Sequence, residues 1–190
     1  MRAAKTAVRD QVLAGRRRLD LAELGEQADR LADVLLAHEE VQRAATVTAY
    51  VSVGREPGTA RLIAGLREAG KRVLLPVVLP DLDLDWAAYE NDESLASARL
   101  GLLEPTGTRL GPDAIATADV VLVPGVAVST DGHRLGRGGG CYDRALGRVP
   151  VGTFTCVLLY DAEVGLDVPV EPHDRPVRAA ATPSGVRQLR

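Results

Sequence analysis

The stretch VLVPGVAVSTDGHRLGRGGGCYDRAL, residues 121–146, carries the signals that decide the fold. It begins as a short apolar run rich in β-branched residues, which is typical of a buried strand, and Pro124 and Gly125 end that run. Residues 136–140 then read Gly-Arg-Gly-Gly-Gly, and a helical pattern starts at Cys141. The stretch therefore predicts a strand, a glycine-rich loop and a helix in succession.

The glycine-rich loop is a candidate anion site. Successive glycines let backbone N–H groups converge on an anion, and the start of a helix adds its own unpaired N–H groups. Arg137, flanked by glycines, can place a forked cation over a phosphate. The alternative is a flexible surface turn with incidental arginines. The loop is no Walker P-loop, because no Gly-Lys-Ser/Thr ends it, and Cys141 stands where the dinucleotide fingerprint requires glycine.

The composition predicts a soluble chain with one domain over residues 1–190. A net charge of −3 argues against a general nucleic-acid surface, so any anion site must be local. No apolar run reaches membrane-spanning length, and the N-terminus lacks a signal-peptide core. Cys141 and Cys156 form neither a CxxC motif nor a metal-ligand spacing, so a reducing, cytoplasmic setting is expected.

Before this stretch lies a second strand–helix–strand pattern. A β-branched run over residues 46–53 predicts a strand, a helical pattern follows from Thr59 to Ala69, and a further strand runs from Gly70 to Pro76. Such a unit implies parallel strands with a right-handed crossover, and ligands bind beyond the carboxyl ends of these strands. Glu56 follows the first strand, where it is either a ligand-binding acid or an exposed loop acid.

The N-terminal segment predicts two helices. Over residues 3–18, Lys5, Arg9 and Arg16 fall on one face, which is either a solvated face or a pair of cations presented to a polyphosphate. The second helix starts at Asp20, a good N-cap, and its leucines recur at helical spacing. Its role is expected to be structural.

The rest of the chain predicts shorter elements. They are an edge strand at 84–89, a short strand near 100–105, a helix at 113–118, strands at 119–123 and 152–159, a helix at 141–148 and a last strand at 177–181. Three prolines between 168 and 176 fix a rigid loop around His173 and Asp174, which form either part of a site or a simple turn.

PGVAVSTDGHRLGRGGGCYDRAL, residues 124–146, resembles the hallmark of the 5-formyltetrahydrofolate cyclo-ligase family, also called methenyltetrahydrofolate synthetase. Further matches follow in the family's order: the N-terminal helix with Lys5 and Arg9, the segment 52–59, Gly70-Lys71, the segment Gly-Leu-Leu-Glu-Pro at 101–105, and the His173-Asp174 loop before Thr182-Pro183. The resemblance spans the chain, and it implies an α/β fold that is a Rossmann-like three-layer sandwich, with a mainly parallel sheet and helices on both faces.

The resemblance implies ATP- and Mg²⁺-dependent closure of 5-formyltetrahydrofolate to 5,10-methenyltetrahydrofolate, with release of ADP and phosphate. A formamide oxygen is a poor leaving group, so a phosphoryl group is transferred to it before N10 of the folate attacks the activated carbon. Phosphoryl transfer needs positioning and charge neutralisation, which suits a backbone cradle, cations and a metal. No nucleic acid, no membrane and a monomeric protein are expected.

The resemblance also assigns roles to residues. Arg137 and Lys5 are the expected catalytic residues, and Asp143 and Asp174 the expected Mg²⁺ ligands. The ATP-binding set is Lys5, Arg9, Arg134, Leu135, Gly136, Arg137, Gly138, Gly139, Gly140, Cys141 and Tyr142. The folate set is Val53, Glu56 and Gly58.

Three positions depart from the family pattern: Cys141 stands where a tyrosine is usual, Val128 replaces an aromatic residue, and Gly58 replaces an acid found in some relatives. These departures concern substrate packing and leave the phosphate and metal groups in place. One rival interpretation is a non-catalytic folate- or nucleotide-binding protein on the same fold. Another is a phosphate-handling isomerase, which would need a clear general base in place of arginines and metal-type acids.

Overall fold

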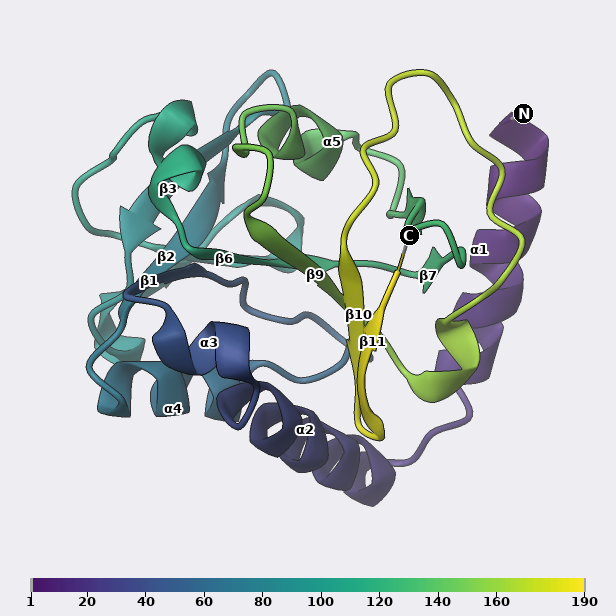
Figure 1. Cartoon of the computed structure of the whole chain (residues 1–190), viewed down its shortest axis with the longest axis horizontal. Helices are drawn as coiled ribbons and strands as arrows, with labels where there is room; N and C mark the ends of the chain where they lie inside the picture. Colours follow the sequence, from purple (N-terminus) through teal and green to yellow (C-terminus); the bar gives the residue numbers. More distant parts are fainter. Residues whose placement is uncertain (1, 190) are drawn as a thin grey trace.

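A seven-stranded sheet runs through the computed structural model, which describes residues 2–189 (Figure 1). The strand order is β11-β10-β9-β6-β1-β2-β3. The five inner strands pair in parallel, whereas the edge strands β3 and β11 pair antiparallel. The bounds are β1 Thr46–Thr48, β2 Arg72–Val78, β3 Leu84–Ala88, β6 Val120–Pro124, β9 Phe154–Leu158, β10 Ala179–Thr182 and β11 Gly185–Gln188.

Helices cover both faces of this sheet. Figure 1 shows α2 (Leu21–Leu36), α3 (Glu39–Arg43) and α4 (Ala60–Glu68) below it and α5 (Cys141–Leu146) above it. The 3-10 helix η3 (Pro112–Thr117) contributes Ile115 to the same core cluster as Ala145 of α5. The chain is therefore a three-layer α/β sandwich with a mainly parallel sheet, which confirms the predicted fold class.

One further helix, two short strand pairs and several 3-10 helices lie outside the main sheet. α1 (Arg2–Arg16) lies beside β7, at the right of Figure 1. Two short antiparallel ribbons are β4 (Leu95–Ser97) with β5 (Leu103–Pro105), and β7 (Ala127–Val128) with β8 (Arg134–Leu135). The remaining 3-10 helices are η1 (Asp92–Ser94), η2 (Arg99–Gly101) and η4 (Asp161–Glu163).

The inner strands are apolar on both sides because each side faces a core. Val73 and Leu75 of β2 belong to one buried cluster, together with Leu31 of α2 and Leu62 of α4. Leu74, between them, belongs to the other cluster, together with Leu146 of α5. Strands covered on both faces read as continuous hydrophobic runs rather than alternating ones. This is why the sequence shows β-branched runs at β1, β6 and β9.

The predicted helix at Asp20 is confirmed down to its cap. The Asp20 side chain accepts a hydrogen bond from the Glu23 N–H, and the Glu23 carboxylate accepts one from the Asp20 N–H. This reciprocal capping box satisfies two donors that a helix start leaves unpaired. Several predicted bounds differ from the structure: the first helix ends at Arg16, the helix at 113–118 is 3-10 and covers 112–117, and the helix at 141–148 ends at Leu146.

The first strand is much shorter than predicted. It was expected over residues 46–53, but β1 ends at Thr48, and Ala49 makes the last backbone hydrogen bond to β2, donated to Leu74 O. Beyond it, side chains take over the backbone groups: Thr59 Oγ1 donates to Tyr50 O at 2.6 Å and accepts from Ser52 N at 2.9 Å. The apolar run therefore leaves the sheet and becomes a loop. The sequence also missed α3 and β11.

The topology places a crevice between β1 and β6. After β1 the chain adds β2 on one side of it, and later adds β6 on the other side. At such a switch point the loops that follow the two strands diverge, and ligands bind in the crevice beyond the carboxyl ends. The loop after β1 contains Glu56, and the segment after β6 contains the glycine-rich loop.

A buried ion pair fixes α1 to this end of the sheet. Arg16 Nε and Nη2 each lie 2.7 Å from an oxygen of Glu163, and Nη2 also donates to Gly125 O at 2.8 Å. The two side chains are 3% and 6% exposed. Gly125 directly follows β6, so Arg16 links the helix that carries Lys5 and Arg9 to the edge of the crevice.

Glu163→Gln is expected to lower the free energy of unfolding by about 3 kcal/mol, because it leaves the Arg16 guanidinium buried without a counter-charge. For a chain of this size the melting temperature should fall by about 6–12 °C. Thermal melts followed by circular dichroism measure this shift. The double variant Arg16→Met/Glu163→Leu removes both charges and should recover most of the loss. A single variant as stable as the parent would contradict the assigned energy.

Candidate functional site

A cavity of about 820 Å³ opens at the crevice, a size in the ordinary range for ligand sites. Within the part of the chain that the structure describes, every predicted site residue lines it except Gly58. The predicted residues in its wall are Lys5, Arg9, Val53, Glu56, Arg134, Leu135, Gly136, Arg137, Gly138, Gly139, Gly140, Cys141, Tyr142, Asp143 and Asp174. Residues from both ends of the sequence therefore meet in one hollow.

Gly58 has a packing role in this structure. A Cβ atom on Gly58 would lie 2.7 Å from Cβ of Ala28 in α2, closer than real Cβ contacts allow. The absence of a side chain lets the loop after β1 approach the helix closely. Gly58, which was predicted to contact the folate, therefore does not line the cavity.

Glu56 is held by both of its oxygens at the wall of the cavity. Oε2 accepts a hydrogen bond from Val53 N at 2.9 Å, and Oε1 accepts one from Arg137 Nε at 2.8 Å. The Glu56 side chain is 7% exposed, whereas that of Arg137 is 55% exposed. The ion pair joins the loop after β1 to the glycine-rich loop, so a predicted folate ligand and a predicted phosphate ligand contact each other directly.

Arg134 is buried and holds Asp143 in place. Its Nη2 donates to Asp143 Oδ1 at 3.2 Å and its Nη1 donates to Pro124 O at 3.2 Å. Its guanidinium carbon lies 5.8 Å from the centre of the Tyr142 ring. The backbone N–H of Arg175 also donates to Asp143 Oδ1, at 3.3 Å. Both hydrogen bonds go to Oδ1, which orients the carboxylate and leaves Oδ2 for another partner.

The glycines give the loop its shape. Gly138 and Gly140 have φ values of +104° and +69°, in the left-handed region that residues with a Cβ rarely adopt. A Cβ on Gly136 would lie 2.7 Å from Arg134 Nη1, so this glycine leaves room for the buried guanidinium. Gly136 O also accepts a hydrogen bond from Arg9 Nε at 3.0 Å. The loop is thereby tied to α1.

Lys5 lies between two carboxylates. Its Nζ is 2.7 Å from Glu171 Oε2 and 2.7 Å from Asp174 Oδ2. Burial lowers the pKa of Lys5, but its hydrogen bonds to Asp174 and Glu171 outweigh this effect and raise the pKa above its ordinary value. Burial raises the pKa of Asp174, but Lys5 holds it below its usual range overall. All three groups are therefore charged at neutral pH.

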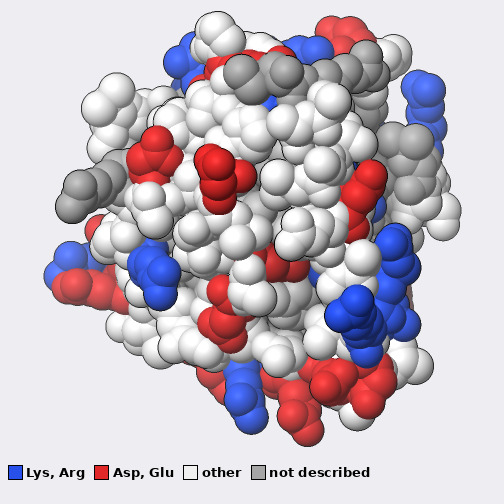
Figure 2. Space-filling view, turned by 90° about the vertical axis from the view of Figure 1, so that its right-hand side faces the viewer, with Lys and Arg blue, Asp and Glu red and all other residues white. Residues whose placement is uncertain are grey.

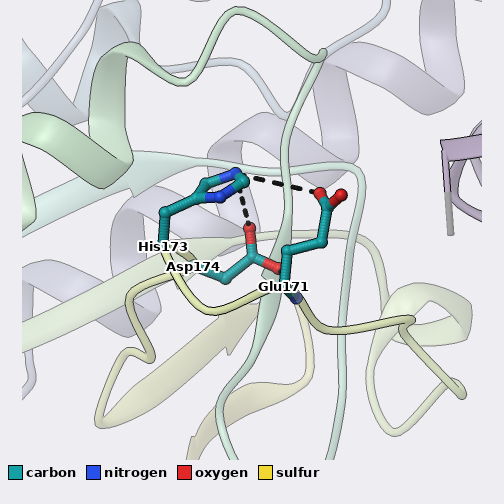
Figure 3. A group of neighbouring side chains, drawn as sticks. All are labelled: Glu171, His173 and Asp174. Atoms are coloured by element: carbon teal, nitrogen blue, oxygen red, sulfur yellow. Dashed lines mark hydrogen bonds and ion pairs between the residues drawn. The ribbon is translucent and has the colours of Figure 1, made fainter.

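His173 completes this cluster. Figure 3 shows its ring turned toward both carboxylates, and Nε2 lies 3.8 Å from Glu171 Oε2 and 3.8 Å from Asp174 Oδ1. Glu171, His173 and Asp174 each offer a ligand atom within 4.8 Å of the others. Residues 171–174 form a turn, closed by a hydrogen bond from Asp174 N to Glu171 O, and this turn lies in the wall of the cavity.

The donor set suits a hard divalent cation. Asp143 and Asp174 both line the cavity and offer carboxylate oxygens, the ligands that Mg²⁺ prefers alongside phosphate oxygens and water. The Lys5 ammonium already rests on Asp174, which shows that this carboxylate is placed to hold a positive charge within the cavity. The residues present therefore fit the predicted metal.

The sequence reasoning missed several residues in the cavity wall, among them Tyr50, Glu104 and Glu171. Tyr50 was hidden in the apolar run predicted as a strand. Burial, together with the nearby Glu56 carboxylate, holds its pKa well above the ordinary value, so its hydroxyl stays protonated at neutral pH. Glu104 lies in the Gly-Leu-Leu-Glu-Pro segment, and its Oε1 accepts a hydrogen bond from Val78 N at 2.9 Å.

The surface around α1 is mixed in charge. In the view of Figure 2, acidic and basic side chains are interspersed among uncharged residues. Among the described helices, none is long and apolar enough to cross a membrane.

Three comparisons with known proteins agree. The model of the 5-formyltetrahydrofolate cyclo-ligase family matches residues 1–183. The 5-formyltetrahydrofolate cyclo-ligase of Mycolicibacterium smegmatis is 38% identical, with 98% of each chain covered, and that of Escherichia coli K12 is 36% identical over 86% of this chain and 90% of its own. The solved 5,10-methenyltetrahydrofolate synthetase of Aquifex aeolicus superposes with a TM-score of 0.84 at 28% identity, covering 98% of this chain and 93% of its own.

Proposed function

The chain belongs to the 5-formyltetrahydrofolate cyclo-ligase family, and on this premise we propose that it closes 5-formyltetrahydrofolate to 5,10-methenyltetrahydrofolate, using ATP and Mg²⁺. The protein is thus an enzyme of the ligase class. One observation supports the proposal above the others. A single cavity joins the buried carboxylate of Glu56, the arginine-bearing glycine loop and the carboxylates Asp143 and Asp174.

The proposed reaction has two steps. The formyl oxygen attacks the γ-phosphorus of ATP, the bond to ADP breaks, and an imidate-like phosphate forms on the folate. The N10 amine then attacks the activated formyl carbon, phosphate leaves with the former formyl oxygen, and N10 loses its proton. Such transfers depend on positioned charge, because negative charge spreads over the moving phosphoryl oxygens.

The residues take distinct parts in this scheme. The Glu56 carboxylate accepts hydrogen bonds from pterin N–H groups and fixes the folate at the inner wall, beside Val53. The backbone of residues 136–140 and the Arg9 and Arg137 guanidinium groups hold the phosphates. Asp143, oriented by Arg134, and Asp174 would hold Mg²⁺, which neutralises charge on the phosphate oxygens when bound. Lys5 then passes from Asp174 toward the phosphates.

The proposal extends to the setting of the protein. We place one domain over residues 1–190, acting as a monomer on a small folate substrate in the cytoplasm, without nucleic acid or membrane as a partner. The net charge of −3 and the mixed charges on the face in Figure 2 argue against a nucleic-acid surface.

The decisive assay follows absorbance at the methenyl-folate band with purified protein, 5-formyltetrahydrofolate, Mg²⁺ and ATP. The expected result is a rise that needs all three additions, matched by an equal release of phosphate. Folate binding without any absorbance change would identify a non-catalytic binding protein instead. Unchanged absorbance together with no folate binding would contradict the proposal that 5-formyltetrahydrofolate is the substrate.

A further inference from the structure

The pair Glu56–Arg137 joins two groups that the proposed reaction uses separately. Arg137 Nε donates to Glu56 Oε1 at 2.8 Å, while Val53 N occupies the other oxygen of the same carboxylate. A pterin N–H that approaches Oε1 must therefore either share that oxygen with the Arg137 guanidinium or displace it. The Nε–H of Arg137 is likewise unavailable to a phosphate while it donates to Glu56.

The burial of the two partners differs, and this decides which one moves. The Glu56 side chain is 7% exposed and anchored by a backbone N–H, whereas the Arg137 side chain is 55% exposed. Gly136 and Gly138 flank Arg137, so the backbone around it has few steric restrictions. Arg137 is therefore the partner that can swing away, and Glu56 the fixed one.

Displacement of Arg137 requires a replacement donor. A buried carboxylate that loses its counter-charge pays a large desolvation cost unless other hydrogen bonds satisfy it. An N–H edge of the pterin supplies such donors at the same oxygen. Solvent does so less well, because the carboxylate is almost fully buried. The folate thus exchanges one N–H donor on Glu56 for another and sets the guanidinium free.

We propose that Glu56 is a positioning residue for Arg137 as well as a folate ligand: it holds the guanidinium away from the phosphates until the folate displaces it. This inference rests on the proposed function. Its consequence is positive coupling between folate and nucleotide, since each ligand is bound better when the other has already broken the ion pair. By linkage, the nucleotide must raise folate affinity by the same factor. ATP is then cleaved mainly when folate is bound.

The test is a double-mutant cycle of Glu56→Gln and Arg137→Ala. The readout is the affinity for adenylyl imidodiphosphate with Mg²⁺ and without folate, measured by calorimetry. Glu56→Gln should tighten nucleotide binding about three- to tenfold, because the guanidinium no longer has a charged partner. Glu56→Gln also removes a negative charge from the cavity, which lowers the repulsion of the phosphates and strengthens nucleotide binding whether or not Arg137 is present. In the Arg137→Ala background only that general effect remains, and the gain should shrink below about twofold.

Glu104→Gln is the charge-matched control, since Glu104 also lines the cavity and accepts one backbone N–H, from Val78. It measures the general effect of losing a carboxylate there. In the parent protein, 5-formyltetrahydrofolate should tighten nucleotide binding by the same three- to tenfold factor, and Arg137→Ala should abolish this coupling. Folate-free ATP hydrolysis should rise in Glu56→Gln and stay low in the double variant.

Equal gains from Glu56→Gln in both arginine backgrounds would overturn the inference, and so would a parent protein that binds both ligands without coupling. Either result leaves the proposed function intact, because cyclisation is measured separately. A parent protein that binds neither 5-formyltetrahydrofolate nor the nucleotide would overturn the proposed function, and this inference with it.

Discussion

Arg137→Ala is expected to lower kcat for methenyl-folate formation by about 10²–10³-fold, the usual effect of removing one positioned donor to developing charge. The guanidinium matters most while the phosphoryl group moves, so the loss should fall on turnover. Folate affinity should stay the same or rise, because the variant leaves Oε1 of Glu56 open to the pterin. Steady-state kinetics with the absorbance assay, together with calorimetric folate titration, separate these two effects.

Arg61→Ala is the matched control for this prediction. Arg61 is also an exposed arginine paired with a carboxylate, Asp33, but it lies outside the cavity lining. Its removal should leave kcat within about twofold of the parent, since an exposed ion pair contributes little to stability. An Arg137→Ala enzyme with the parent's turnover would remove Arg137 from the reaction.

Asp143→Asn is expected to raise the Mg²⁺ concentration for half-maximal activity by about 10–100-fold, the effect typical of losing a group that holds or orients a metal. The amide keeps an oxygen that can accept the Arg134 hydrogen bond but carries no charge for the cation. A Mg²⁺ titration of initial rates at saturating ATP and folate measures the change. Asp174→Asn should act in the same direction and also free Lys5 from one of its two partners.

Asp113→Asn provides the control for the metal prediction. Asp113 is an exposed carboxylate paired with Arg148, away from the cavity lining, so its loss should leave the Mg²⁺ dependence unaltered. A metal dependence for Asp143→Asn that equals the parent's would exclude Asp143 from the metal site.

The length of β1 shows where sequence reasoning reached its limit. Residues 46–53 have the β-branched, apolar composition of a strand, and the first three residues form one. The run then leaves the sheet because Thr59 and Glu56 supply hydrogen-bond partners for Tyr50, Ser52 and Val53. A local pattern reports that a segment is buried. It does not report whether another strand or a folded-back side chain satisfies its backbone.

The short helix α3 and the edge strand β11 were missed for a related reason. α3 has five residues, too few for a hydrophobic period to appear, and β11 gains its hydrogen bonds only from β10. In contrast, Asp20 and Glu23 form their capping box within one turn of chain, so the sequence alone predicted where α2 begins.

By itself the sequence determined the class of fold, the order of its main elements and the residues that would gather at one edge of the sheet. These follow from hydrophobic runs, turn residues and caps, which act over a few positions along the chain. The pairing of the charges, in contrast, depends on the three-dimensional arrangement of the loops. Lys5 meets Asp174 across 169 positions and Arg137 meets Glu56 across 81, because the topology brings separate loops to one crevice. Burial there makes each charge depend on its partner, and no local pattern encodes that choice.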